Sequence, residues 1–342
     1  MKHQGHIFVH DFKPPQHIKR IIAVQLCSDS FFTSTMRRFD DFQIQTEIVL
    51  FKDSILTQAP NLWGVHSRPL RTTKPFSEYL DKDLFNELDE STGIVFIYNS
   101  AGQFKYLEEE QSIPWYFLID IYEDLYRASQ TNPCINVAFI DQNQHWKDWR
   151  DFYMVSSVRL PGSGKIVEVS AFMQERTKQF LVDQGYQHGD KGAFVEVGRL
   201  YGGSAVLFAL GLKDSGSKNV LFSFDPVPQP YCQRYAKLYG VDNQIAFIDL
   251  TSVDGEVFWQ AEDMPQITCL HIDGNHAYDF VLKDIQSWEK HLKPGGVMMF
   301  HDYGACGEMA GATNAIYESV ICRQENWKAF DQIEGSFIAT RR

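Results

Sequence analysis

The sequence contains few cysteines, and they form no recognisable pattern. No two of them make a Cys-x-x-Cys pair, which argues against a zinc cluster. A chain of 342 residues can fold stably without disulfides, so scattered thiols fit a reducing cytoplasm, the location we expect. The cysteines are Cys27, Cys134, Cys232, Cys269, Cys306 and Cys322.

Long apolar runs are also missing. The longest runs have the length of a strand, so we expect no segment to span a membrane and no membrane partner. Residues 1–10 are polar and contain histidines, and they lack the charged stretch and apolar run of a signal peptide.

Positive charge is scarce. The chain has 32 Lys and Arg against 44 Asp and Glu, a formal net charge of -12, and no block of basic residues. Because nucleic-acid binding needs a positive face, the sequence disfavours a nucleic-acid partner, although a locally basic cleft stays open. The remaining composition, 44% hydrophobic and 14% aromatic, is that of a globular protein, and the length indicates about two domains.

The N-terminal part predicts a small α/β domain over residues 1–160. Residues 112–114 (Ser-Ile-Pro) mark the start of a helix, and Tyr122 and Leu125 belong to its apolar face together with Leu118 and Ile121. No chemical motif is found in this domain. Short runs rich in β-branched and aromatic residues predict buried strands at 21–24, 47–51, 94–98 and 137–140.

Residues 160–165 (LPGSGK) have the composition of a linker between two domains, and they also resemble a truncated phosphate-binding loop. The full phosphate-binding pattern needs a glycine where this chain has Arg159, and Ser or Thr where it has Ile166. The linker is therefore the favoured interpretation, with a second domain over residues 166–342.

In this second domain, strands alternate with helices, which predicts a parallel sheet covered on both faces. Ligands of such sheets bind beyond the carboxyl ends of the strands, so the residues that follow each strand are the candidates for chemistry. The predicted strands are 193–197, 220–224, 245–248, 267–272 and 297–300, followed by two apolar runs near 329–330 and 337–339. The predicted helices are 172–181, 205–212, 231–239, a short piece near 257, 281–292 and 315–322.

The first two of these strands end in residues that suit a nucleotide-like ligand. Residues 196–204 (EVGRLYGGS) form a glycine-rich turn into a helix, whose N-terminus supplies free N–H donors. Alone, this pattern also fits a tight packing turn. Asp225 ends the second strand, where a carboxylate can accept both hydrogen bonds of a ribose diol. It can equally begin the following helix, and both interpretations stay open.

Acids and imidazoles follow the fourth strand and the fifth. Residues 271–278 (HIDGNHAY) close the fourth strand, and residues 292–303 (LKPGGVMMFHDY) contain the fifth. Asp273 and Asp302 can therefore converge on one hard cation, with His301 available as an imidazole ligand. His276 lies three residues after Asp273, close enough to take a proton from a metal-bound hydroxyl.

The ordered set EVGxxxGGS, FDP, IDGNHAY and LKPGGVMMFHDY makes the chain from about 166 to 340 resemble a class I S-adenosylmethionine-dependent methyltransferase. Within that class it is similar to the metal-dependent O-methyltransferases of macrolide sugars and to cephalosporin-hydroxylase-like relatives. The resemblance implies a Rossmann-like, mostly parallel sheet of seven strands whose final strand is antiparallel. It also implies methyl transfer to a hydroxyl of a small molecule, either a sugar or another natural product.

The resemblance further implies which residues bind the donor and the metal. Asp273 and Asp302 match metal-ligand positions, and His276 matches the general base. His301 stands where the best-studied relatives have an acid, so the third ligand is open, and Mn²⁺ or Fe²⁺ becomes an alternative to the expected Mg²⁺. The implied S-adenosylmethionine-binding residues are Glu196, Gly198, Gly202, Ser204, Asp225, Thr251, Ser252 and Asp273, with Thr251 and Ser252 replacing the relatives' Asp-Ser.

Other interpretations of these residues remain. His276 can simply cap the following helix, and His301 with Asp302 can be a structural pair without metal. His271 lies within a strand, where a packed side chain is favoured over a ligand. The alternative functions are metal-independent O- or N-methylation and a non-catalytic binding protein. The N-terminal domain has three open roles: covering the active site, binding a carrier, or mediating homo-oligomerisation.

Overall fold

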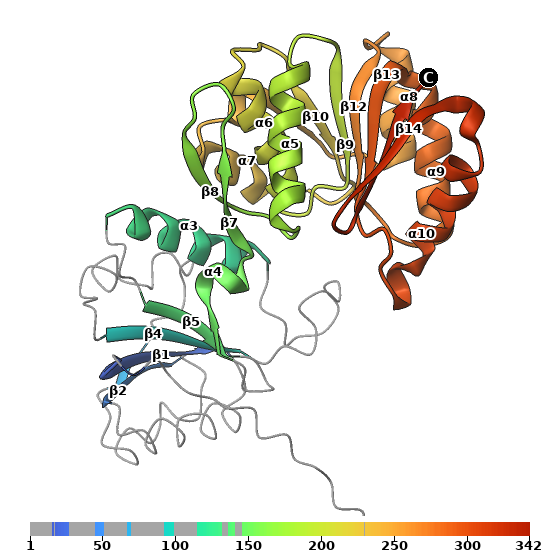
Figure 1. Ribbon diagram of the computed structural model, residues 1–342. Coiled ribbons are helices and arrows are strands. Elements are labelled where there is room, and N and C mark those ends of the chain that lie inside the picture. The colour runs from blue at the N-terminus through green and yellow to red at the C-terminus, as the bar shows by residue number, and fades with distance from the viewer. Residues whose placement is uncertain are drawn as a thin grey trace, which may run out of the picture. The chain divides into compact units, whose positions relative to one another are not determined.

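The computed structural model describes residues 16, 18–26, 45–50, 67–69, 92–98, 115–131, 136–140, 146–228 and 230–342. The chain divides into two compact units, Met1–Tyr153 and Met154–Arg342 (Figure 1). Within the described residues, no helix combines the length and the apolar character needed to cross a membrane.

The N-terminal unit contains a sheet in the order β3-β2-β1-β4-β5-β6, parallel except where β6 pairs with β5. The four predicted strands are confirmed as β1, β2, β4 and β5. The other two strands have three residues each, too short to produce a detectable alternation in the sequence. The bounds are β1 (Arg20–Leu26), β2 (Gln45–Leu50), β3 (Ser67–Pro69), β4 (Thr92–Tyr98), β5 (Asn136–Ile140) and β6 (Trp146–Asp148).

The predicted helix of this unit is α3 (Trp115–Thr131), while its start signal at 112–114 lies outside the described residues. Tyr122 and Leu125, from the expected apolar face, are fully buried. The ring of Tyr122 packs 5.1 Å from that of Tyr153, centroid to centroid, just beyond the short helix α4 (Trp149–Phe152). Aromatic packing therefore forms much of the described core of this unit.

The second unit begins with the antiparallel hairpin of β7 (Val155–Arg159) and β8 (Ile166–Ser170). Residues 160–165, expected to be a linker, form the turn of this hairpin, because Pro-Gly-Ser composition suits turns as well as linkers. The backbone N–H groups of Gly162 and Ser163 donate to the carboxylate of Asp214. The donors that a phosphate-binding loop would use are thus already paired with an internal anion.

A seven-stranded sheet organises the rest of the second unit and confirms the predicted fold (Figure 1). Its order is β11-β10-β9-β12-β13-β15-β14; the first five of these are parallel, and the final strand β15 is antiparallel to both neighbours. Strand order reverses between β9 and β12, which is where such sheets bind ligands. The bounds are β9 (Ala193–Val197), β10 (Leu221–Phe224), β11 (Ile245–Ile248), β12 (Ile267–Ile272), β13 (Leu292–Phe300), β14 (Trp327–Ile333) and β15 (Ser336–Arg341).

The predicted helices are present with shifted ends, and they cover both faces of the sheet. Figure 1 shows α5, α6 and α7 on one side and α8, α9 and α10 on the other. On the second side, Trp288 packs against Phe224 and Trp259, with ring centroids 5.3 and 5.8 Å apart. The bounds are α5 (Glu175–His188), α6 (Gly203–Asp214), α7 (Pro230–Leu238), α8 (Ser252–Ala261), α9 (Tyr278–Trp288) and α10 (Ala310–Ile316), which continues as a π-helical turn, Tyr317–Ile321.

Helices α5 and α6 cross at unusually short range, because each has a glycine at the crossing. A Cβ on Gly211 of α6 would lie 2.0 Å from the carbonyl oxygen of Val182, and one on Gly185 of α5 would lie 2.3 Å from that of Phe208. This backbone contact explains why α5 extends beyond the predicted end at residue 181. Its second half packs on α6 through a smooth surface rather than through large apolar side chains, which the periodicity of the sequence does not reveal.

We expect Gly211→Ala to lower the free energy of unfolding by about 3 kcal/mol, because the added methyl overlaps a backbone carbonyl. On an uncrowded helix the same change would stabilise the protein by about 0.5–1 kcal/mol. The control is Gly216→Ala, just after α6, where φ is +75° and a Cβ meets nothing within 4 Å; its cost should be about 1–2 kcal/mol. Urea unfolding measures both, and a stabilised Gly211→Ala would contradict the packing described.

Candidate active site

Two adjacent strands bring the predicted acids and imidazoles to one edge of the sheet. Asp273 directly follows β12, and His301 and Asp302 directly follow β13. These strands pair in parallel, with Ile272 opposite Phe300, so their carboxyl ends coincide. The N–H of His301 also donates to the carbonyl of Ile272, 3.1 Å away, which ties the two loops together.

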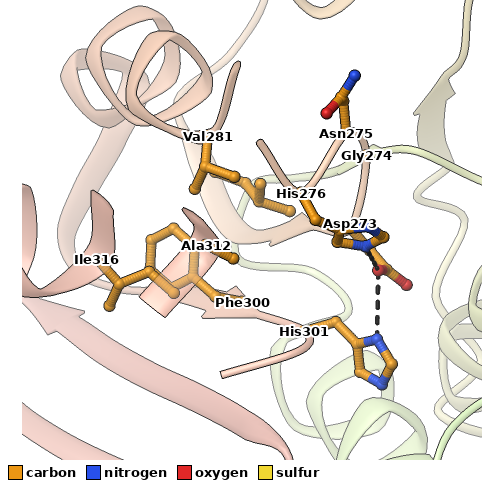
Figure 2. Close-up of a pocket in the computed structure, with 10 residues that line it drawn as sticks. Asp273, Gly274, Asn275, His276, Val281, Phe300, His301, Ala312 and Ile316 are labelled. Carbon is orange, nitrogen blue, oxygen red and sulfur yellow. Dashed lines mark ion pairs between the residues drawn. The ribbon is translucent and has the colours of Figure 1, made fainter. Parts of the chain in front are cut away.

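Each imidazole of this cluster contacts both carboxylates. Nε2 of His276 lies 2.9 Å from Oδ2 of Asp302 and 3.6 Å from Oδ1 of Asp273. Nδ1 of His301 lies 3.2 Å from Oδ1 of Asp273 and 3.3 Å from Oδ2 of Asp302. Figure 2 shows the contact of Asp273 with His301, and His276 on the loop that leads from Asp273 towards α9. The cluster contains two potential cations and two anions, so its charges can balance.

The backbone at Asp302 adopts an uncommon conformation. Its φ is +57°, in the left-handed region that residues other than glycine rarely adopt. Strain of this kind costs of the order of 1–3 kcal/mol and is concentrated at functional sites. The conformation is therefore a reason, independent of any motif, to place function at this strand end.

The four side chains shift one another's pKa. Contacts with Asp273 and then Asp302 raise the pKa of His276 to about 9. Burial opposes protonation of His301, but the two carboxylates outweigh it and raise its pKa to about 11. Burial alone would raise the pKa of each carboxyl, yet the imidazoles hold both well below the usual range. At neutral pH the cluster is thus two imidazolium–carboxylate pairs.

The atoms that converge as a potential metal site come from Asp273, His276 and Asp302, whose ligand atoms lie within 4.8 Å of one another. Two carboxylates and an imidazole suit a divalent cation such as Mg²⁺, Mn²⁺ or Fe²⁺. His301, the expected third ligand, contacts both carboxylates but does not belong to this converging group. His276 thus joins the converging group, while His301 borders it through both carboxylates.

A small cleft adjoins the cluster (Figure 2). Asp273, His276 and His301 line its polar side. Its other wall is apolar and comes from the strand ends and from helices α9 and α10. The apolar lining residues are Ile272, Val281, Phe300, Ala312 and Ile316.

The predicted glycine turn lies beside this cluster. Gly198 has a φ of +86°, and a Cβ there would lie 2.2 Å from the carbonyl oxygen of Asp273. Gly202 has a φ of +93° and is the N-cap of α6. Glycine is therefore required at Gly198 for close approach to β12, and at Gly202 for the turn into the helix.

Glu196 and Ser204, both expected near the cofactor, contact each other in the interior. The carboxylate of Glu196 is fully buried and accepts hydrogen bonds from the hydroxyls of Ser204 and Ser223. Nδ1 of the fully buried His271, a packed residue as expected, lies 3.5 Å from Glu196. Because Glu196 has no exposed surface, we interpret it as a residue that stabilises the glycine turn from the protein interior.

Asp225 lies partly exposed at the end of β10. One carboxylate oxygen accepts the N–H of Val227 and the other accepts the N–H of Arg199, at 2.9 and 3.1 Å. These bonds organise its own turn, whereas the helix α7 begins only at Pro230. A carboxylate has about four acceptor positions, so two remain for a ribose diol.

Thr251 and Ser252 make structural contacts. Thr251 caps α8 by accepting the N–H of Asp254, and the hydroxyl of Ser252 accepts the indole N–H of Trp288 at 2.9 Å. Sequence reasoning missed two residues of this region, Arg199 and Asp249, whose side chains pair at the strand ends. Both residues could have been noticed in the sequence, because Arg199 is a cation inside the glycine turn and Asp249 is an acid directly after β11.

Residues 195–303 match the family described as a methyltransferase domain, and no curated protein matches the chain. Among solved structures, the chain is similar to an O-methyltransferase from Bacillus cereus in complex with SAH (14% identity, 50% of this chain and 82% of that chain, TM-score 0.43). It is also similar to a putative O-methyltransferase from Klebsiella pneumoniae (14%, 51% and 84%, 0.42). A third similar structure is the MycE methyltransferase of the mycinamycin biosynthetic pathway in complex with Mg, SAH and mycinamycin VI (14%, 50% and 51%, 0.38).

The matched residues run from β9 through the loop after β13, and so include both the glycine turn and the acid–histidine cluster. Together with the seven-stranded sheet, this match identifies residues 195–303 of the second unit as similar to a methyltransferase domain. The region that matches a methyltransferase domain follows a separate α/β unit in the chain.

In the metal-free protein, we expect the His276 imidazole to titrate near pH 9, which NMR can follow. Asp302→Asn removes one carboxylate partner and should lower this pKa, while the pKa of His188, on α5, should not change. A raised pKa in the folded state means that the pairing stabilises the fold fully below pH 6.5, and that this stability is lost as the pH rises through 9. A wild-type His276 that titrates near 6.5 would contradict the paired arrangement.

Proposed function

We propose that the methyltransferase domain transfers the methyl group of S-adenosylmethionine to a hydroxyl of a small molecule, assisted by a divalent cation and a histidine base. The observation that carries this proposal is the convergence of Asp273, Asp302 and His276 at the edge of the sheet that also holds the glycine turn. In the reaction the methyl group leaves sulfur for the acceptor oxygen, the donor becomes SAH, and the hydroxyl proton passes to the base.

The donor would lie across the ends of β9 and β10. Gly198 has no side chain that would keep a ligand away from the backbone of the turn. The first N–H groups of α6 have no acceptor earlier in the helix. The two unused acceptor positions of Asp225 suit the ribose hydroxyls. Methyl transfer is an in-line displacement, so alignment of donor and acceptor is the main contribution of the protein.

Asp273 and Asp302 would hold the cation. The Mg in the MycE complex supports Mg²⁺ as that cation. A bound divalent cation would lower the pKa of the acceptor hydroxyl and orient it. An oxygen-rich pair favours Mg²⁺, while a neighbouring imidazole makes Mn²⁺ or Fe²⁺ acceptable.

His276 would act as the base once its carboxylate partners are engaged elsewhere. Paired with Asp273 and Asp302 it is an imidazolium at neutral pH, which cannot accept a proton. A cation bound to the same carboxylates would oppose protonation of His276 and leave its imidazole neutral. The two imidazoles then divide the roles: His301 completes the ligand set while His276 takes the proton, or the reverse.

A metal-independent methyltransferase is the second candidate, because the two imidazoles already neutralise both carboxylates. The proposed acceptor is a small molecule such as a sugar or another natural product, in keeping with the mycinamycin bound to MycE. The net charge of -12 disfavours a nucleic-acid acceptor. We further propose a cytoplasmic location and leave homo-oligomerisation to the N-terminal unit as one of its open roles.

Donor binding is tested by isothermal titration with SAH. Asp225→Ala should weaken binding by about 1–3 kcal/mol, because the ribose hydroxyls lose a buried partner. The control is Asp190→Ala, an exposed acid before β9 and thus at the opposite edge of the sheet, which should bind SAH normally. Absence of SAH binding by the wild-type protein would remove the basis of the proposal.

Measuring both turnover and metal affinity distinguishes which histidine is the base and which is the metal ligand. As the base, His276 should lose about 10²–10⁴-fold in turnover on change to alanine while keeping its affinity for Mn²⁺ and SAH. His301→Ala should then weaken Mn²⁺ binding. If instead His276→Ala loses the metal and His301→Ala keeps it, the two roles are exchanged. Turnover should vanish with a chelator and return with added metal, so full activity in excess EDTA would support the metal-independent candidate.

A further inference from the structure

A buried arginine spans the strand ends on the donor side of the site. Arg199 follows Gly198 in the glycine turn and is only 2% exposed. Its Nη1 donates to the carbonyls of Ser223 and Ile248, each at 3.0 Å. Its Nη2 donates to the carbonyl of Val227, at 3.3 Å, and pairs with the carboxylate of Asp249. The guanidinium thus connects the end of β9 with β10, β11 and the loops that follow them.

This arrangement requires an arginine. A buried charge is costly unless it is paired and hydrogen-bonded, and Asp249 supplies the opposite charge while three carbonyls supply acceptors. The guanidinium presents its donors in a rigid planar fork, which reaches several acceptors on two strands at once. A lysine ammonium is a single point and cannot bridge the same distances.

The backbone of the same residue holds the proposed ribose partner. The N–H of Arg199 donates to Oδ2 of Asp225, whose own N–H donates to the carbonyl of Ile248 at 3.1 Å. That carbonyl also accepts from the Arg199 side chain. Backbone and side chain of one residue therefore contact both acids at these strand ends, Asp225 and Asp249.

We propose that Arg199 is a positioning residue that sets the adenosine half of the donor site, by holding Asp225 and Asp249 in register with the glycine turn. This inference rests on the proposed function, in which Asp225 binds the ribose. The reacting groups follow β12 and β13, whereas the Arg199 side chain contacts β10, β11 and their loops. Loss of the guanidinium should therefore weaken donor binding and leave the transfer step unchanged.

The test compares binding of SAH and of 5′-methylthioadenosine, which has the adenosine but lacks the amino-acid portion. Arg199→Met should weaken both ligands by the same factor, about ten- to hundredfold. Arg199→Lys should recover part of this loss, because it keeps the charge without the fork. The matched control is Lys213→Met at the other end of α6, which also removes a cation from a backbone carbonyl, that of Gly240 at 2.8 Å. It should bind both ligands normally.

Kinetics distinguish positioning from a general contribution to stability. The KM for S-adenosylmethionine should rise with the loss of affinity, while kcat at saturating donor stays within about twofold. A folded Arg199→Met with wild-type affinity for both ligands overturns the inference, and so does a loss of kcat at unchanged KM. If Arg199→Met does not fold, a folded Arg199→Lys with wild-type affinity overturns it equally. A wild-type protein that binds neither ligand instead refutes the proposed function.

Discussion

The contact between the ends of β9 and β12 is the constraint on which both halves of the site depend. The N–H of Asp273 donates to the carbonyl of Val197 at 2.8 Å, and the backbone of Gly198 lies against that of Asp273. A side chain on Gly198 would force the strands apart. Because the glycine turn follows one strand and Asp273 follows the other, this contact sets the separation of the two halves of the proposed site.

The acid–histidine cluster and the donor site are stabilised in different ways. At the ends of β12 and β13, two imidazoles and two carboxylates pair with each other while remaining partly exposed. Beside the glycine turn, Glu196 and Arg199 are buried and form hydrogen bonds within the protein. The first arrangement suits chemistry, and the second suits a fixed binding surface.

Several motif residues make hydrogen bonds within the protein. Glu196 and Ser204 belong to the glycine-turn motif, yet they bond to each other beneath the turn. Thr251 and Ser252 follow β11, yet they cap α8 and bond to Trp288. Residues of one motif therefore also shape the loop that carries it.

Much of the fold and part of the site could be predicted from the amino-acid sequence. Strands β9, β11 and β12 have their predicted bounds, because each is a mostly apolar run bounded by polar residues or glycine. Asp273 and Asp302 could be placed together, since parallel strands end at the same edge of a sheet. Local patterns do not specify which atoms of distant residues meet. The hairpin turn at 160–165, the inward carboxylate of Glu196, the reach of Arg199 and the convergence of His276 depend on packing between elements, so they became visible only in the folded chain.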